Sequence, residues 1–245
     1  MKHIIIVGAS SGIGRRVALD FARMGWNVGI AARRTERLEE VCGLYPDNIV
    51  CKSIDVIADD AVERFYDLIE LNGGADVVLY AAGVGWSNPE LNLSEDMQTV
   101  AVNVGGFTRI VNAAYRYFRD TANCRRGQIA AITSVAGTKG LGVSAAYSAS
   151  KRYCQIYLEA LGQLARMQRV AVDITDIRPG FIRTPLLKAG RRYPMLMDLD
   201  YAAPRIELAI LRRKRVQVID WRWNVAVGLW RIIPAALWTR LPVKL

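Results

Sequence analysis

The sequence predicts an α/β fold, a doubly wound parallel sheet of about seven strands with helices on both faces. Short segments rich in valine and isoleucine alternate with longer segments of helical periodicity over 245 residues, which is typical of βαβ units. No linker, repeat or low-complexity tract interrupts the alternation, so we expect a single domain over residues 1–219 and a C-terminal helical extension over residues 220–245. The expected strands are Ile4–Val7, Val28–Ala32, Ile49–Ile54, Val77–Tyr80, Gln128–Thr133, Val170–Ile177 and Val216–Ile219. The expected helices include Asp59–Leu71, Glu95–Phe118, Ala146–Met167 and Ala202–Arg212.

The first strand leads directly into a glycine-rich turn. Ile4–Val7 is continuously apolar, as expected for a strand that is buried on both faces. The turn carries Gly8, Gly12 and Gly14, and Val17–Ala22 then has a helical pattern. Strand, glycine turn and helix predict a Rossmann-type dinucleotide site, because glycine lets a pyrophosphate approach the backbone and the helix N-terminus offers free N–H groups. The alternative is a plain tight turn of small residues.

The second strand ends at Ala32, where an enzyme that uses NAD usually carries an acidic residue. Arg33 and Arg34 follow it. Without an acid to repel a 2′-phosphate, and with a guanidinium that can bind one, the site is predicted to prefer NADP over NAD. Alternatively, the two arginines simply begin a solvated loop.

The later strands end in small or polar residues. Asp55 follows the third strand, Ala82 and Gly83 the fourth, and Ser134 the fifth, while residues 178–184 follow the sixth. In open parallel sheets, ligands bind beyond the C-terminal ends of the strands. We therefore expect these residues to meet at one edge of the sheet.

Tyr147 and Lys151 lie four residues apart on an expected helix, so they share one face of it. A free phenol has a pKa of roughly 10, and a nearby ammonium favours the phenolate. Such a pair can give or take a proton near neutral pH. The same spacing also arises by chance on many helices, where it places a surface tyrosine beside a solvated lysine.

The composition argues against several other chemistries. His3 is the only histidine and opens the first strand, so neither a Ser-His-Asp triad nor a histidine-bound metal is expected. The cysteines form no Cys-x-x-Cys pair, which favours free thiols in a reducing, cytoplasmic compartment; they are Cys42, Cys51, Cys124 and Cys154. No signal peptide pattern opens the chain, and no apolar run reaches the ~18 residues of a membrane-spanning helix.

The net charge of +10 is partly gathered in short basic clusters, at Arg33–Arg34, Arg125–Arg126, Arg191–Arg192 and Arg212–Arg215. Nucleic acid is one explanation of such charge. No nucleic-acid-binding motif accompanies the clusters, so we expect no nucleic-acid partner. We interpret the first cluster as contacting an anionic cofactor and the last as facing an anionic surface.

Taken in order, these motifs resemble those of the short-chain dehydrogenase/reductase family over residues 2–218. Asn103 corresponds to the family's helix asparagine, Ser134 to its catalytic serine, and Tyr147 with Lys151 to its catalytic pair. The resemblance implies that Tyr147 transfers a proton to or from the substrate oxygen and that Ser134 polarises the carbonyl. It also implies that Lys151 holds the nicotinamide ribose and that Asn103 holds a water between Lys151 and solvent. The implied reaction is hydride transfer between NADP(H) and a small-molecule carbonyl or alcohol, without a metal.

The resemblance also implies a set of cofactor-binding positions. Asp55 corresponds to the acid that contacts adenine, although it could instead be a helix N-terminal acid. Residues 178–184 correspond to the segment that packs on nicotinamide. The full set is Gly8, Ser10, Ser11, Gly12, Ile13, Gly14, Arg33, Arg34, Asp55, Val56, Ala82, Gly83, Tyr147, Lys151, Pro179, Gly180, Ile182 and Thr184.

The chain departs from the family at the end of the fourth strand. Tyr80 and Ala81 stand where two asparagines usually precede the Ala-Gly pair. The chain lacks those two amides, and with them the hydrogen bonds that tie this strand end to its neighbours. It keeps every group that transfers a proton.

Residues 221–241 form an apolar segment with four of the six tryptophans. Pro234 is predicted to kink or end its first helix. A narrow stripe of polar or small residues is expected at Asn224, Gly228, Arg231 and Ala235. The other faces must be buried in the subunit's own substrate cleft, in a homo-oligomer, or at the inner face of a membrane. We expect removal of the segment to change association and not the core chemistry.

Other functions remain open beside that of a soluble reductase. One is a nucleotide-binding regulatory protein without catalysis. Another is a membrane-associated reductase of hydrophobic, lipid-like ketones, and a third is a basic module that binds nucleic acid or membranes. The lid between Thr184 and Pro204 is expected to select the substrate, because loops of this kind vary freely.

Overall fold

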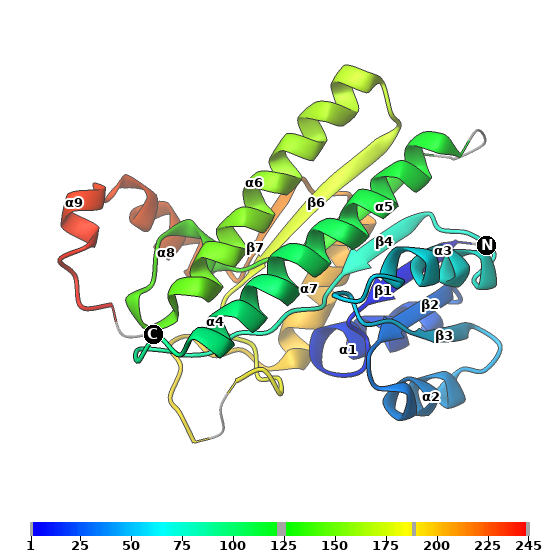
Figure 1. Ribbon diagram of the computed structural model, residues 1–245, viewed down its shortest axis with the longest axis horizontal. Helices are drawn as coiled ribbons and strands as arrows, with labels where there is room; N and C mark the ends of the chain where they lie inside the picture. The colour runs from blue at the N-terminus through cyan, green and yellow to red at the C-terminus, as the bar shows by residue number, and fades with distance from the viewer. Residues whose placement is uncertain (1, 122–125, 188–189, 244–245) are drawn as a thin grey trace.

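In the part of the chain that the computed structural model describes, residues 2–121, 126–187 and 190–243, seven parallel strands form one sheet (Figure 1). Cys124 and Arg125 lie outside the described residues. The strand order is β3-β2-β1-β4-β5-β6-β7, so the connections reverse direction between β1 and β4. The strands are β1 (His3–Val7), β2 (Asn27–Ala32), β3 (Ile49–Ser53), β4 (Val77–Tyr80), β5 (Gly127–Ile132), β6 (Val172–Pro179) and β7 (Val216–Ile219).

Helices cover both faces of this sheet, which confirms the predicted doubly wound, single-domain fold. One face packs under α1 (Gly12–Arg23), α2 (Thr35–Leu44), α7 (Leu199–Leu211) and α8 (Trp221–Ile232). The other face packs under α3 (Ala61–Leu71), α5 (Phe107–Asp120) and α6 (Ala145–Gln168). The central strands are therefore buried on both sides, and Ile4, Ile5 and Ile6 of β1 have no exposed surface.

The predicted helix Glu95–Phe118 is one helical rod of three segments, which are α4 (Leu93–Val100), the π-helical η1 (Ala101–Gly106) and α5. A π-helical turn widens the backbone, and such turns often occur at functional sites. Figure 1 shows α4 and α5 running beside α6, and both α4 and η1 contact α6.

Several predicted boundaries differ from the structure by one to three residues, and two of these shifts have a clear structural reason. Strand β6 continues to Pro179, because Arg178 and Pro179 pair with Val218 and Ile219 of β7. Helix α7 begins at Leu199, before Pro204, which lies in its second turn. A proline there removes only one backbone hydrogen bond near the helix start, so it does not mark the boundary.

The C-terminal extension forms α8 and the short α9 (Ala235–Trp238), with Pro234 between them, as predicted. Ala235 belongs to α9, so the expected four-residue stripe is wrong in that member. Figure 1 shows α8 and α9 at one end of the molecule, beside the start of α6. Among the described residues, no helix combines the length and the apolar composition needed to cross a bilayer.

Candidate functional site

A cleft opens at the C-terminal ends of the strands, above the point between β1 and β4 where the connections reverse. This is where open α/β sheets bind their ligands. Every predicted cofactor-binding residue lines the cleft, and so do Ser134, Tyr147 and Lys151. Of the predicted site residues, only Asn103 does not line it.

The turn between β1 and α1 needs its glycines. A Cβ on Gly8 would lie 2.4 Å from the backbone nitrogen of Ala82, and one on Gly14 would lie 2.3 Å from the oxygen of Gly8. Gly8 also has a φ of +98°, which favours glycine. Ser11 precedes α1 without capping it by a side-chain hydrogen bond, so the helix N-terminus can receive an anion. The tight turn and the uncapped helix fit the pyrophosphate of a dinucleotide.

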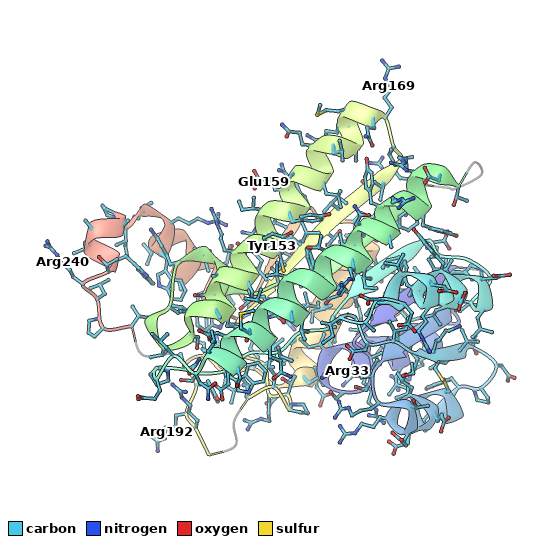
Figure 2. All side chains as sticks on the ribbon, viewed as in Figure 1. Arg33, Tyr153, Glu159, Arg169, Arg192 and Arg240 are labelled. Atoms are coloured by element: carbon cyan, nitrogen blue, oxygen red, sulfur yellow. The ribbon has the colours of Figure 1, made fainter. Side chains whose placement is uncertain are left out.

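Two exposed arginines stand at the rim of the cleft beyond β2. The guanidinium of Arg34 donates to the hydroxyl of Ser10 at 2.9 Å and to that of Ser11 at 3.4 Å. Arg33 lies beside it and is labelled near α1 in Figure 2. The two guanidinium groups place several N–H donors at the end of the second strand. Such donors fit a phosphate on the adenosine side of a dinucleotide.

Asp55 lies in the cleft after β3, and its carboxylate accepts the backbone N–H of Ile57 at 3.3 Å. The residue that precedes α3 is Asp60. Asp55 therefore closes a turn at the strand end and is not the N-terminal acid of a helix. Its carboxylate is half-buried beside Val56, whose side chain packs on Gly106 of η1.

Tyr147 and Lys151 lie on the first turns of α6. The Lys151 ammonium is buried, donates to the backbone oxygen of Ile132 at 3.1 Å, and lies 5.7 Å from the centroid of the Tyr147 ring. The Tyr147 ring packs on Gly85, where a Cβ would lie 2.4 Å from the ring. The ring is therefore held between the loop after β4 and the side chain of Lys151.

Ser134 follows β5 and is held by its backbone and by its side chain. Its hydroxyl oxygen accepts the N–H of Ala136 at 3.1 Å, and its carbonyl accepts the side-chain amide of Gln155 at 2.7 Å. Gln155 is not among the residues predicted from the sequence. Because Tyr147, Lys151 and Gln155 follow each other at intervals of four, the same helix-face argument could have found it.

A buried ion pair ties together the strand ends that carry Ser134 and Pro179. Asp176 accepts a hydrogen bond from the Thr133 hydroxyl at 2.5 Å and pairs with Arg178 at 2.6 Å. Both charged side chains are less than a tenth exposed. This pair was not predicted from the sequence, because strand pairing, and not a local motif, brings Thr133 to Asp176.

Asn103 lies on η1 and is buried. Its amide nitrogen donates to the oxygen of Val84 at 2.7 Å and to the Ser150 hydroxyl at 3.0 Å, and its oxygen accepts the N–H of Val84 at 2.9 Å. It thus joins the loop after β4 to α6. Its expected role in holding a water stays a prediction.

The departure at Tyr80 is compensated within the fold. The Tyr80 hydroxyl donates to the carbonyl of Val102 at 3.1 Å, and its ring meets Phe107 edge to face. Burial raises the pKa of this phenol well above its usual range. One tyrosine therefore ties the end of β4 to η1, without the two family amides.

The far wall of the cleft, beyond Tyr147, is mainly aromatic and aliphatic. The loops and the lid contribute Trp86, Leu141, Val143, Phe181, Leu186 and Tyr193. The lid also contributes Arg191, whose guanidinium lies over the Tyr193 ring at 5.8 Å. From the C-terminal extension come Trp223 and Trp230. This end of the cleft is therefore mainly apolar.

The doubly wound sheet and its glycine-turn cleft define a protein of the dinucleotide-binding oxidoreductase class. The short chain dehydrogenase family model matches residues 2–193, and the chain belongs to this family of NAD(P)-dependent oxidoreductases. An uncharacterized oxidoreductase of Myxococcus xanthus is 30% identical over 247 residues, which cover 96% of this chain and 94% of that protein.

Two solved structures are similar in fold. The 3-ketoacyl-(acyl-carrier-protein) reductase from Brucella melitensis, complexed with NADH, is 24% identical with a TM-score of 0.79 and covers 89% of this chain and 96% of its own. An alcohol dehydrogenase from the archaeon Thermococcus sibiricus, complexed with 5-hydroxy-NADP, is 26% identical with a TM-score of 0.73 and covers 89% and 95%. Because the Brucella reductase is less than 25% identical, its similarity is evidence for the fold alone.

Proposed function

We propose that this protein is an NADP-dependent oxidoreductase that interconverts a carbonyl compound and the corresponding alcohol. The observation that carries the proposal is one cleft with the glycine turn at one end and Ser134, Tyr147 and Lys151 at the other. When bound there, the dinucleotide supplies or accepts the hydride. The residues of the chain must then bind it, orient the carbonyl and move one proton.

The side chains are arranged for these tasks. The Ser134 oxygen accepts the N–H of Ala136. Its hydroxyl donates to the oxygen of Pro179 only at the long distance of 3.5 Å, so its hydrogen can turn to a substrate carbonyl. Tyr147 gives its phenolic proton to that oxygen, or takes one from an alcohol. The Lys151 ammonium donates one of its three hydrogens to the oxygen of Ile132. The other two are available for a ribose hydroxyl and for a group beside Tyr147.

We assign the cofactor positions to the glycine turn, the residues after β2, β3 and β4, and the segment from Pro179 to Thr184. Preference for NADP rests on Ala32, Arg33 and Arg34, which present cations and no acid where a ribose 2′-substituent would lie. The two similar solved structures hold one nucleotide of each kind, 5-hydroxy-NADP and NADH, so the proposed preference rests on these residues alone.

Turnover tests the proposal against a nucleotide-binding protein without catalysis. Purified protein is mixed with NADPH and a panel of ketones and aldehydes, and consumption of reduced nicotinamide is followed by its absorbance. We expect oxidation that depends on the carbonyl compound. Tight NADPH binding without any turnover, in either direction and with the whole panel, would favour the regulatory alternative.

Partners and location stay predictions. The outward face of α8 exposes Trp221, Val225, Leu229 and Ile232, which are apolar and follow helical spacing. A homo-oligomer contact or a peripheral membrane contact would cover this face. The expectation of no nucleic-acid partner likewise stays a prediction.

A further inference from the structure

We propose that the C-terminal extension sets the substrate specificity of this site and positions its catalytic loop. Three of its side chains, Trp223, Trp230 and Trp238, are here called the Trp row. The substrate class that this row selects is a carbonyl compound that carries a bulky, flat apolar group, such as an aromatic ring. The inference rests on the proposed function and deepens it.

The extension is bonded to the loop between Ser134 and Tyr147. The indole N–H of Trp238 donates to the carbonyl of Gly140 at 2.7 Å. From the other direction, the Lys139 ammonium donates to the carbonyl of Ile233 at 2.8 Å. Two reciprocal hydrogen bonds therefore fix residues 139–140 to the junction of α8 and α9.

Apolar packing reinforces these hydrogen bonds. Trp238 is buried against Ala136 and Leu141, which flank the loop, and Tyr147 packs against the same small cluster. Ala136 is also the residue whose N–H holds the Ser134 hydroxyl. A shift of Trp238 would therefore change the positions of both Ser134 and Tyr147.

The rings of the Trp row touch one another from α9 back to the end of β6. Trp238 and Trp230 have centroids 5.4 Å apart, and Trp230 and Trp223 have centroids 6.0 Å apart. Trp223 is fully buried on Gly180, where a Cβ would lie 2.0 Å from the indole nitrogen. Gly180 belongs to the segment assigned to the nicotinamide, so the row spans the site from its loop to its strand end.

Two members of the row border the cleft, and of these the partly exposed Trp230 offers surface to a ligand while Trp223 lies buried beside it. Trp223 and Trp230 line it together with Phe181, Leu141 and Tyr147. Burying apolar surface against such a wall yields roughly 25 cal/mol per Å². A large flat apolar group is stabilised in this way because it buries much of the wall, whereas a small polar carbonyl compound leaves the wall exposed to solvent. The wall therefore favours bulky apolar carbonyl compounds.

The test compares Trp230→Ala and Trp238→Ala with Trp221→Ala, a matched control on the same extension whose indole is 71% exposed. The probes are benzylacetone, which carries a phenyl group, and acetone, both assayed with NADPH. In Trp230→Ala, we expect the kcat/KM for benzylacetone to fall about 10-fold or more, mainly through KM, while that for acetone changes little.

Trp238 is a positioning residue, so we expect its substitution to change kcat and not the preference between the two ketones. Trp238→Ala should lower kcat about 10-fold with both ketones, because the Gly140 loop loses its anchor, and NADPH affinity should stay unchanged. Trp238→Phe keeps a ring without the N–H donor and should recover part of kcat. Trp221→Ala should match the wild type in every assay.

Ketone binding separates failure of this inference from failure of the proposed function. Calorimetry measures the affinity of benzylacetone for the NADPH-bound protein, and so tests the contact with the apolar wall without requiring turnover. Binding that weakens in Trp230→Ala supports the wall even in a protein that turns nothing over. Equal losses with benzylacetone and acetone, or a wild-type preference for acetone, would overturn it. Should Trp230→Ala fail to fold, Trp230→Leu keeps the volume apolar and carries the same expectation at smaller size.

Discussion

At the scale of single residues, the reacting centre depends on groups whose second contacts hold them still. Gln155 and Ala136 hold Ser134, and Ile132 holds Lys151. None of these contacts is a proton-transfer step. They fix the orientation of the groups that the family resemblance identifies. Proton transfer and cofactor binding can therefore each be tested by changing one side chain.

Tyr147→Phe removes the proposed proton donor and keeps the ring that packs on Gly85. We expect kcat to fall by roughly 10²–10⁴, the usual contribution of general acid–base catalysis. NADPH affinity, measured by fluorescence titration, should stay nearly unchanged because the glycine turn and the arginines are intact. Activity close to that of the wild type would refute the assigned role.

Arg33→Ala removes an exposed guanidinium at the rim of the cleft. A charge-assisted hydrogen bond to a 2′-phosphate contributes roughly 1.5–3 kcal/mol, so the KM for NADPH should rise about 10-fold or more while that for NADH changes little. Arg34→Ala serves as a comparison, since Arg34 also donates to Ser10. Equal effects of Arg33→Ala on both cofactors would count against a 2′-phosphate contact.

At the scale of elements, the contact between α1 and α7 encloses a pair of carboxyl groups outside the cleft. Glu207 of α7 is buried, its Oε1 has no hydrogen-bond partner among the described residues, and it interacts with Asp20 of α1. Asp20 is paired with Arg16 at 2.5 Å and with Arg23 at 2.8 Å. Burial, followed by the Asp20 carboxylate, raises the pKa of Glu207 to about 7.

The raised pKa has a definite sign for stability. Glu207 binds its proton more tightly in the fold than in the unfolded chain, whose glutamate pKa is roughly 4.3. The contribution of Glu207 to the free energy of unfolding therefore falls as pH rises from about 4.3 to about 7 and is constant above that. The packing of α1 on α7 is thus strongest in mild acid.

Glu207→Gln should remove this dependence, because an amide stays neutral and can donate to Asp20. Urea unfolding at about pH 8 should show the variant to be more stable than the wild type by on the order of 2 kcal/mol, with a smaller difference at about pH 5. Glu159→Gln, on the exposed face of α6 (Figure 2), is the control and should be neutral. A loss of stability at both pH values would contradict the expectation.

At the scale of the whole molecule, the extension has two faces with different surroundings. The inward face places Trp223 and Trp230 against the cleft, and the outward face exposes Trp221 and Leu229 to solvent. This division answers part of the question that the sequence left open. The subunit's own cleft buries one face, while a second copy or an anionic membrane stays the predicted partner of the other.

Removal of residues after Asp220 tests both faces at once. Because Lys139 and Gly140 lose their partners, we now expect truncation to lower kcat at least 10-fold, in place of the sequence-based expectation that only association changes. Light scattering and co-sedimentation with anionic liposomes report the outward face. Unchanged activity, assembly and liposome binding together would show that neither face has the proposed role.

Much of the cleft could be predicted because its motifs are local. A strand followed by Gly8, Gly12 and Gly14 specifies its own turn, and Tyr147 with Lys151 needs only the helical repeat to share a face. Their meeting follows from the general rule that parallel strands end at one edge. Strand boundaries such as that of β6 escaped, since a partner strand, and not local propensity, extends the pairing to Pro179.

The sequence by itself thus determined the doubly wound fold, the family and the position of each family motif, because these depend on hydrophobic periodicity and on short runs of residues. Only the tertiary structure decided how distant residues serve them. It placed the Tyr80 hydroxyl on Val102, the Thr133 hydroxyl on Asp176 and the Trp238 indole on Gly140. Each of these contacts joins segments that are far apart along the chain, so its formation depends on the packing of whole elements and leaves no periodic signal in the sequence.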